Sequence, residues 1–268
     1  MLPSAFGQYD GEFFRSGYWR DGKAEFNTYT AKIVRYGAAR DCEVTHIVVR
    51  EPWDAAQNVK PDDWQRPGAG NVLKLNQILY IPTGMYFYQQ MHSSFWNIPE
   101  TGPARLVKWS LTSNDGCGNT WKMGVRSEKG WRYEWRTYWD GMAGGEETVA
   151  ASEDAMFADE LPLVVRALDF RQPVGEMSMP LLPGIIGSKK DRLDAKSARF
   201  TWETTKERIV VKVASAQGNH RFALDKEFPH KLLEWEMPDG GSLKLRQSLK
   251  IDYWNRNRPE DTELIHAK

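Results

Sequence analysis

Aromatic and charged side chains alternate with a period of two between residues 131 and 139. One side of this alternation carries Trp131, Tyr133, Trp135 and Trp139, and the other side carries Arg132, Glu134 and Arg136. Successive side chains of a β-strand point to opposite faces of the sheet, so the segment is predicted to be a strand with one broad aromatic face. The same alternation recurs along much of the chain, which predicts a large antiparallel sheet.

About ten or eleven segments show this strand pattern, and turn residues separate them. They form two groups, which occupy residues 25–139 and residues 197–254. Residues 171–187 are rich in Pro, Gly and Met and are predicted to be a crossing loop between the groups. We therefore expect residues 1–268 to form a single domain that is mainly β, either a large curved antiparallel sheet or an incomplete β-barrel.

One helical region is predicted near residues 152–168, between the two groups of strands. Ser152 is an N-cap candidate, and the acidic residues Glu153 and Asp154 suit the positive end of a helix. Apolar residues then recur near helical spacing. Pro162 interrupts the pattern and predicts a bend or a restart of the helix. We expect this region to cover the open side of the curved sheet.

The charge balance argues against two classes of partner. The chain has 36 Lys and Arg residues against 36 Asp and Glu residues, so no overall field attracts nucleic acid or an acidic membrane surface. Hydrophobic residues make up 41% of the sequence, which excludes general disorder. No apolar run approaches the roughly 20 residues that a transmembrane helix needs. We expect a folded protein without a nucleic-acid partner or a transmembrane segment, and the sequence leaves its oligomeric state open.

The two cysteines, Cys42 and Cys117, lie in no CxxC motif and no Cys/His cluster. Zinc sites usually place their ligands at such short spacings, so neither a metal nor a cofactor is predicted. Cys117 has a glycine on each side, which would leave its sulfur accessible. Three alternatives follow for this residue: a catalytic thiol activated by His92 or His46, a disulfide with Cys42 in an exported protein, or a cysteine packed in a turn.

The catalytic hypotheses have simpler structural alternatives. His92 follows a run of aromatic residues, and a lone histidine in such a place is more often a hydrogen-bonded structural residue than an acid or a base. Asp140 and the pair Glu146 and Glu147 lie near Trp139, as two carboxylates beside a sugar-stacking ring would in a glycosidase. The glycines between these carboxylates favour a flexible turn that carries solvated charges.

The aromatic side chains are the strongest candidates for a ligand site. Large rings on the inner face of a curved sheet would hold lipid chains or stack on sugars. The candidate ligand-binding residues are Trp109, Trp121, Trp131, Tyr133, Trp135, Trp139 and Trp202. The alternative is that the same rings form an ordinary hydrophobic core.

Five short motifs resemble a family of uncharacterised exported bacterial proteins. They are YWRDGKAE at residues 18–25, RYG at 35–37, CGNTW at 117–121, EFPH at 227–230 and LKIDYW at 249–254. Some members of that family carry the label septum-formation inhibitor, which belongs to an unrelated nucleotide pyrophosphatase and implies nothing about this chain. The resemblance implies a periplasmic or cell-envelope location and a half-open β fold like that of bacterial lipoprotein carriers. Such an analogy of fold does not assign a function by itself.

The leading functional hypothesis is a non-enzymatic cell-envelope protein that binds an apolar or amphipathic molecule, such as a lipid, on the concave aromatic face of a β half barrel. The first alternative is a hydrolase-type enzyme that uses Cys117 with a histidine. The second is a structural subunit whose tryptophan-rich surface docks another protein. No signal-peptide pattern precedes Gly7, so export is expected from the resemblance alone.

Overall fold

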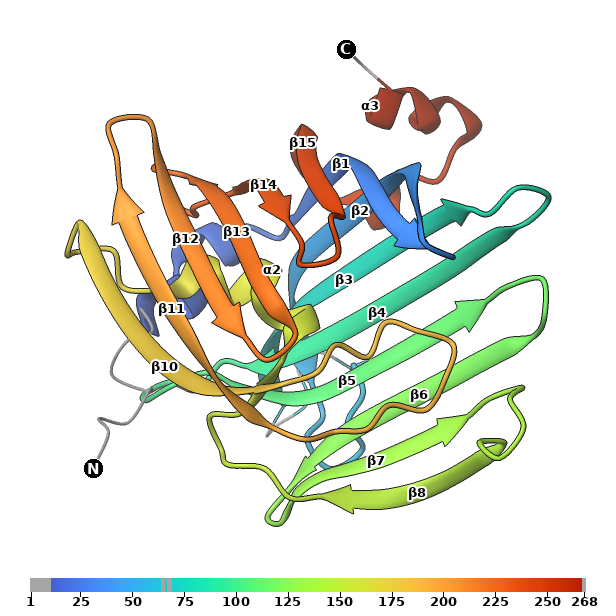
Figure 1. The fold of residues 1–268 in the computed structure, drawn as a ribbon. Helices are drawn as coiled ribbons and strands as arrows, with labels where there is room; N and C mark the ends of the chain where they lie inside the picture. Colours follow the sequence, from blue (N-terminus) through green and yellow to red (C-terminus); the bar gives the residue numbers. More distant parts are fainter. Residues whose placement is uncertain (1–10, 64–65, 67–68, 267–268) are drawn as a thin grey trace.

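A computed structural model describes residues 11–63, 66 and 69–266 of the protein. Within this part of the chain, 15 strands form one sheet (Figure 1). The first eight are β1 (Ala24–Arg35), β2 (Ala38–Trp53), β3 (Gly70–Pro82), β4 (Phe87–Asn97), β5 (Arg105–Asn114), β6 (Asn119–Ser127), β7 (Gly130–Arg136) and β8 (Gly144–Val149). The others are β9 (Met156–Phe157), β10 (Val174–Leu182), β11 (Lys196–Thr204), β12 (Arg208–Ser215), β13 (Gly218–Asp225), β14 (Leu232–Glu236) and β15 (Ser242–Ile251). The stretch ahead of Gly7, which lacks a signal-peptide pattern, lies outside the described residues.

Short helices accompany the sheet. They are α1 (Gly11–Arg15), η2 (Gly17–Trp19), η3 (Ala158–Glu160), α2 (Leu161–Val164), η4 (Val165–Ala167), η5 (Tyr253–Asn255), η6 (Pro259–Thr262) and α3 (Glu263–His266). None of the described helices is long and apolar enough to cross a membrane.

The sheet consists of two meanders joined along one pair of strands. Its order is β8-β7-β6-β5-β4-β3-β2-β1-β15-β14-β13-β12-β11-β10-β9, and all neighbours are antiparallel except β9 and β10. Strand β1 pairs with β15, where Ala24 lies opposite Ile251, so the beginning and the end of the fold meet in the middle of the sheet. We call β1 to β8 the first arm and β9 to β15 the second arm.

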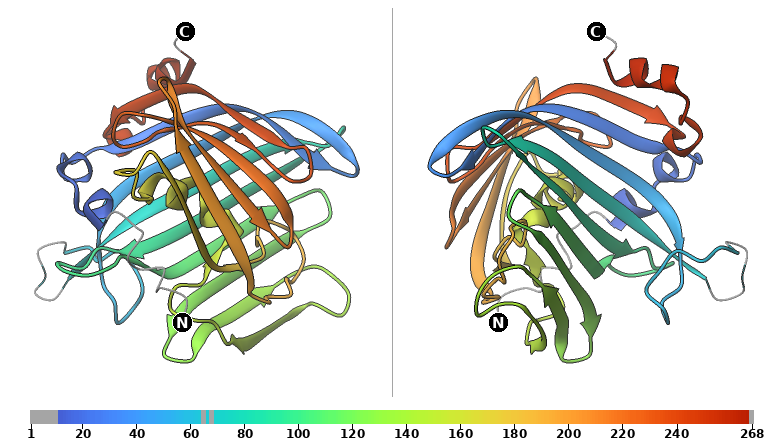
Figure 2. Two further views of the ribbon diagram at one scale, coloured as in Figure 1. Left: turned by 60° about the vertical axis from the view of Figure 1, so that its left-hand side comes forward. Right: turned by 90° about the vertical axis from the view of Figure 1, so that its right-hand side faces the viewer.

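The sheet bends until the inner faces of the two arms face each other (Figure 2). Strands β8 and β9 are its free edges, because each has a hydrogen-bonded neighbour on one side only. The sheet is therefore not closed into a barrel. The prediction of a mainly β fold with a large curved sheet or an incomplete barrel is confirmed.

The predicted helical region lies between the arms but begins later than Ser152. Met156 and Phe157 form the short strand β9, and helical structure runs from Ala158 to Ala167. Pro162 occupies the first turn of α2, where a missing N–H costs no intrahelical hydrogen bond, so it starts the α-helix instead of bending it. All residues of α2 and η4 are buried, and the one charged side chain among them, Arg166, forms a buried ion pair with Glu25.

Strand β10 corrects the prediction of a crossing loop over residues 171–187. Met177, Met179 and Leu181 alternate inward along this strand, which pairs with β11. Pro180 is tolerated because β10 has a second neighbour only at Leu181 and Leu182, so one side of the strand is otherwise outside the ladder. A crossing segment does exist, but it lies after the strand, at residues 183–195.

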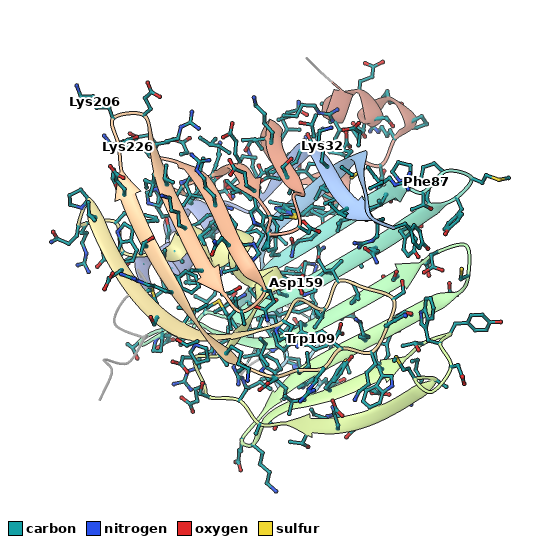
Figure 3. The ribbon with its side chains drawn as sticks, in the orientation of Figure 1. Lys32, Phe87, Trp109, Asp159, Lys206 and Lys226 are labelled. Carbon is teal, nitrogen blue, oxygen red and sulfur yellow. The ribbon has the colours of Figure 1, made fainter. Side chains whose placement is uncertain are left out.

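The hydrophobic core fills the space between the arms. One cluster of buried side chains includes residues from both arms and from the helical region. Figure 3 places Trp109 and Asp159 in this interior, whereas Phe87 lies at the rim of the sheet. The candidate site therefore lies within a large apolar core that contains a few charged groups.

Candidate functional site: a cavity between the two arms

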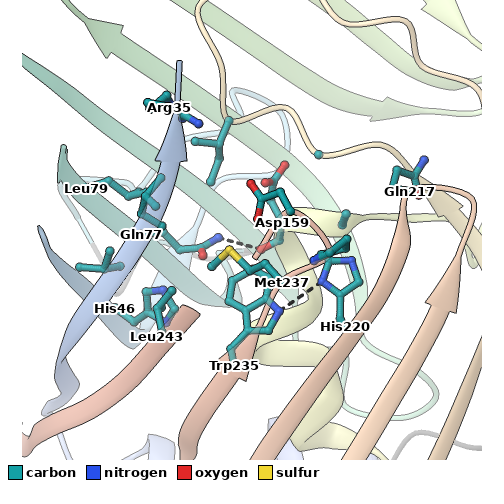
Figure 4. A pocket seen from close by; sticks show the side chains of 17 residues that line it. Arg35, His46, Gln77, Leu79, Asp159, Gln217, His220, Trp235, Met237 and Leu243 are labelled. Carbon is teal, nitrogen blue, oxygen red and sulfur yellow. Dashed lines mark hydrogen bonds between the residues drawn. The ribbon is translucent and has the colours of Figure 1, made fainter. Parts of the chain in front are cut away.

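A cavity of about 410 Å³ opens between the arms, and residues of both arms line it (Figure 4). Its main apolar lining residues are Ile33, Val44, Leu79, Trp235, Met237 and Leu243. Its polar lining residues include Arg35, His46, Gln77, Asp159, His220 and Asp239. We call this space the inter-arm cavity.

Strand register places the walls of the inter-arm cavity. Val44 lies opposite Leu79 on the first arm, and His46 lies opposite Gln77 two residues further along β2. On the second arm, Trp235 lies opposite Leu243. Directly opposed side chains on the same face of a sheet are in contact range, so three cross-strand pairs build most of the two walls.

His220 presents an uncharged imidazole to the cavity. The indole N–H of Trp235 donates to His220 Nδ1 at 3.2 Å, as Figure 4 shows. An indole nitrogen can only donate, so Nδ1 of His220 is the acceptor and the proton of the neutral ring is on Nε2. Burial lowers the pKa of His220 to about 4, which keeps the ring uncharged at neutral pH.

His46 is a second uncharged imidazole in the wall. It is 3% exposed, and its ring centroid lies 4.8 Å from that of Tyr29. Burial lowers the pKa of His46 to about 3, and the positive charge of Arg166 acts in the same direction. The two histidines therefore contribute polarity to the inter-arm cavity but no positive charge.

Asp159 is the buried carboxylate of the inter-arm cavity. Its side chain accepts a hydrogen bond from the backbone N–H of Ile185, in the crossing segment. Its backbone carbonyl accepts a hydrogen bond of 2.7 Å from Gln77 Nε2, which ties η3 to the first arm. Burial raises the pKa of Asp159 to about 7.

A second buried carboxylate lies behind the cavity wall. Glu160 Oε2 accepts a hydrogen bond from the indole of Trp96 at 3.2 Å, and Glu160 Oε1 lies 3.5 Å from His92 Nε2. Gln77 Nε2 donates to His92 Nδ1 at 3.1 Å, so it connects this group to the cavity. Burial raises the pKa of Glu160 to about 8 and lowers the pKa of His92 to about 3.

These pKa shifts predict that the free energy of unfolding falls as the pH rises from 6.5 to 8. Glu160 keeps a proton in the folded protein up to about pH 8, whereas the unfolded chain releases it near pH 4.5. The folded state therefore binds more protons in this window, and Glu160 alone lowers stability by at most about 1.4 kcal/mol per pH unit as the pH approaches its folded pKa. Asp159 adds to this loss up to its folded pKa of about 7. The buried neutral histidines make stability rise with pH, but only below their unfolded pKa of 6.5, where the unfolded chain binds the additional protons.

Urea unfolding at both ends of this pH window measures the effect. Glu160→Gln is expected to flatten the dependence on pH, because an amide does not titrate. Glu153→Gln is the control, since Glu153 is exposed. Parallel profiles for the wild type and Glu160→Gln would show that Glu160 does not titrate in this range.

The structure does not bring the two catalytic candidates together. Cys117 is exposed in the turn between β5 and β6, whereas His92 is fully buried in β4. Within the described part of the chain, no hydrogen bond joins Cys117 to His92 or His46. Both cysteines have free thiols, and burial raises the pKa of the half-buried Cys42 to about 11.

Most of the predicted aromatic residues lie in the core of the first arm. Trp109, Trp131 and Tyr133 are fully buried, and Trp135 is nearly so. Trp202, on β11 of the second arm, is also nearly buried. Phe157 of β9 packs edge-on against two of these rings, with centroids 5.2 Å from Trp109 and 5.3 Å from Trp131. The other two predicted ring residues, Trp121 and Trp139, are partly buried.

The crossing segment covers the aromatic side of the first arm. The fully buried Lys122 donates hydrogen bonds to the carbonyls of Ile185 and Lys189 and to the carboxylate of Asp191. The ammonium group of Lys190 lies 4.4 Å from the ring centroid of Trp135, and that of Lys189 lies 4.5 Å from the ring centroid of Trp139. None of the seven predicted ring residues lines the inter-arm cavity. Their role in ligand binding stays a prediction from the sequence.

The residues that do line the inter-arm cavity were mostly not predicted. His46 was considered only as a base for Cys117, and Gln77, Asp159 and His220 were not considered. One signal was present: Gln77 occupies the same face as Leu75 and Leu79 in β3, all buried, so a polar side chain interrupts an inward apolar face. Buried polar residues of this kind are more informative than buried apolar ones.

Comparison with known proteins gives no match to a family model or a curated protein and two similar solved structures. Two solved structures share features of the fold. One is a DUF1089-family protein of Pseudomonas aeruginosa, 13% identical, with a TM-score of 0.37 over 60% of this chain and 82% of that chain. The other is a β-barrel-like protein of the domain of unknown function DUF1849 from Brucella abortus, 9% identical, with a TM-score of 0.47 over 86% of this chain and 98% of that chain.

Proposed function

We propose that this protein binds a small apolar or amphipathic molecule in the inter-arm cavity, and that it does so in the cell envelope. The observation that carries the proposal is the cavity of about 410 Å³ with apolar walls from both arms and a few polar groups inside. Small-molecule sites are typically concave and mostly apolar, with volumes of roughly 300–1,000 Å³ and a small number of polar groups. The envelope location is supported by the resemblance to exported bacterial proteins.

The architecture favours a preformed site. The walls are cross-strand pairs within long strands, so their side chains are held by the backbone ladder. A ligand would pay little ordering entropy in such a site, and it would gain about 25 cal/mol for each Å² of apolar surface removed from water. The uncharged histidines and Gln77 would orient the polar part of an amphipathic molecule without attracting ions.

Filling the inter-arm cavity is expected to weaken binding of an apolar fluorescent probe. Leu79→Trp adds a large ring to the wall, since Leu79 lines the cavity and is 7% exposed. We expect the Kd of N-phenyl-1-naphthylamine to rise by about tenfold or more, because the probe and the new ring compete for one space. Titration of the purified full chain by fluorescence measures this Kd.

A neighbouring substitution provides the matched control. Tyr80 follows Leu79 in β3 but is exposed on the opposite face, so Tyr80→Trp adds an indole outside the cavity. We expect this variant to bind the probe as the wild type does. An equal Kd for Leu79→Trp and Tyr80→Trp, or no probe binding by the wild type, would contradict the proposed function.

A further inference from the structure

Asp159 is a buried carboxylate that forms no ion pair with any side chain of the described residues. It lines the inter-arm cavity, is 9% exposed and accepts a hydrogen bond from the backbone N–H of Ile185. Buried carboxylates are normally paired, because removing an isolated charge from water is costly. The absence of a partner within the described chain points to a partner from outside it.

The neighbouring cations are already engaged elsewhere. Lys122 pairs with Asp191 at 2.6 Å and donates to two backbone carbonyls, so its charge lowers the pKa of Asp159 without forming an ion pair with it. Arg35 donates to Gln90 Oε1 at 3.0 Å and to the carbonyl of Val34 at 3.1 Å. The two histidines of the cavity are uncharged, as burial dictates. Asp239, which is exposed, adds a second carboxylate to the lining.

We propose that the ligand of the inter-arm cavity is a cationic amphiphile, whose ammonium group pairs with the Asp159 carboxylate and whose apolar part lies against Leu79, Met237 and Leu243. This inference rests on the proposed binding function. An ammonium group would supply the missing charge partner and a further hydrogen-bond donor in a site of low polarity. An anionic amphiphile would meet two carboxylates, and an alcohol would form a hydrogen bond without charge pairing.

Burial also determines the protonation state of Asp159 when it has no cationic partner. It raises the pKa of Asp159 to about 7, so a proton takes the place of a cationic partner near neutral pH. At pH 8 the carboxylate is mostly ionised, while a primary alkylamine remains protonated. This pH therefore gives the cleanest comparison between charged and uncharged ligands.

Three molecules with twelve carbon atoms each test the inference. Dodecylamine, dodecanol and dodecanoate compete below their micellar concentrations for bound N-phenyl-1-naphthylamine at pH 8, with the purified full chain. We expect dodecylamine to displace the probe at a concentration about tenfold lower than dodecanol, and dodecanoate to be the weakest competitor. In Asp159→Asn, the concentrations of amine and alcohol that displace the probe are expected to differ by no more than about twofold. Asp41→Asn, an exposed carboxylate on β2, is expected to keep the wild-type ratio.

The outcomes separate this inference from the proposed function. Equal displacement by amine and alcohol in the wild type, or an undiminished preference for the amine in Asp159→Asn, overturns the cationic ligand while binding in the cavity stands. No probe binding in the wild type overturns the proposed function and the inference together. The order in which the three molecules displace the probe from the wild type tests the cationic ligand even if Asp159→Asn does not fold. The circular dichroism spectrum of the variant shows whether it folds.

Discussion

Replacement of Arg166 by leucine is expected to lower the free energy of unfolding by about 3–5 kcal/mol. The Arg166 guanidinium donates two hydrogen bonds of 2.9 Å to the two carboxylate oxygens of Glu25 on β1. Arg166 is 2% exposed and Glu25 is not exposed at all. Burial raises the pKa of Glu25, but the charge and the hydrogen bonds of Arg166 outweigh it and hold the pKa below its usual value. The single substitution therefore leaves a buried carboxylate without its counterion.

A double substitution separates the ion pair from packing. Glu25→Leu with Arg166→Leu removes both charges, so neither partner is left unpaired, and we expect it to be less destabilising than Arg166→Leu alone. Urea unfolding of the wild type, both single variants and the double variant measures the coupling. Additive effects of the two single substitutions would show that the pair does not act as a unit.

Replacement of Phe157 by alanine is expected to cost about 3–5 kcal/mol of stability, because a large cavity opens between fully buried rings. Phe157 packs against Trp109 and Trp131 and joins the second arm to the aromatic core of the first. Its strand β9 has only two residues and pairs only with β10. The Phe157 ring therefore links the short edge strand β9 directly to the core of the first arm.

Phe87 offers the matched control for this prediction. It is 63% exposed at the start of β4, so Phe87→Ala removes no core contact and is expected to change stability by less than about 0.5 kcal/mol. Thermal and urea unfolding of both variants test the contrast. A similar loss for the two phenylalanines would mean that Phe157 does not anchor the core.

Most of the fold could be predicted from local pattern. The alternation around Tyr133 predicts a strand with an aromatic inner face, and that face is buried in the structure. Two prolines show the limit of local pattern. Pro162, expected to bend or restart the helix, lies in the first turn of α2, and Pro180, which falls within the predicted crossing loop, lies in a strand near the edge of the sheet. The effect of a proline depends on whether the fold needs a backbone N–H hydrogen bond at its position. The sequence does not show which carbonyl groups lie next to that position in the folded protein.

The candidate site could be predicted much less well. Asp159 follows the two residues of β9 and precedes α2, and nothing in that stretch of sequence marks an acid that faces a cavity. Its surroundings come from Gln77 on the first arm and from the crossing segment, through hydrogen bonds that span large distances in sequence. His220 and Trp235 likewise meet only because β13 and β14 pair. Large aromatic rings are as suited to a core as to a ligand site, so their size does not distinguish the two.

The sequence by itself determined the β character of the protein, the inner and outer faces of its strands and the presence of one buried helical region. These properties depend on period-two and near-helical spacing, which neighbouring residues express without reference to the rest of the chain. Only the tertiary structure decided that the aromatic face is covered by Phe157 and the crossing segment, and that the space left open is lined by His46, Asp159 and His220. The physical reason is that a cavity is whatever packing leaves unfilled when two arms meet, and the pairing of β1 with β15 sets how they meet.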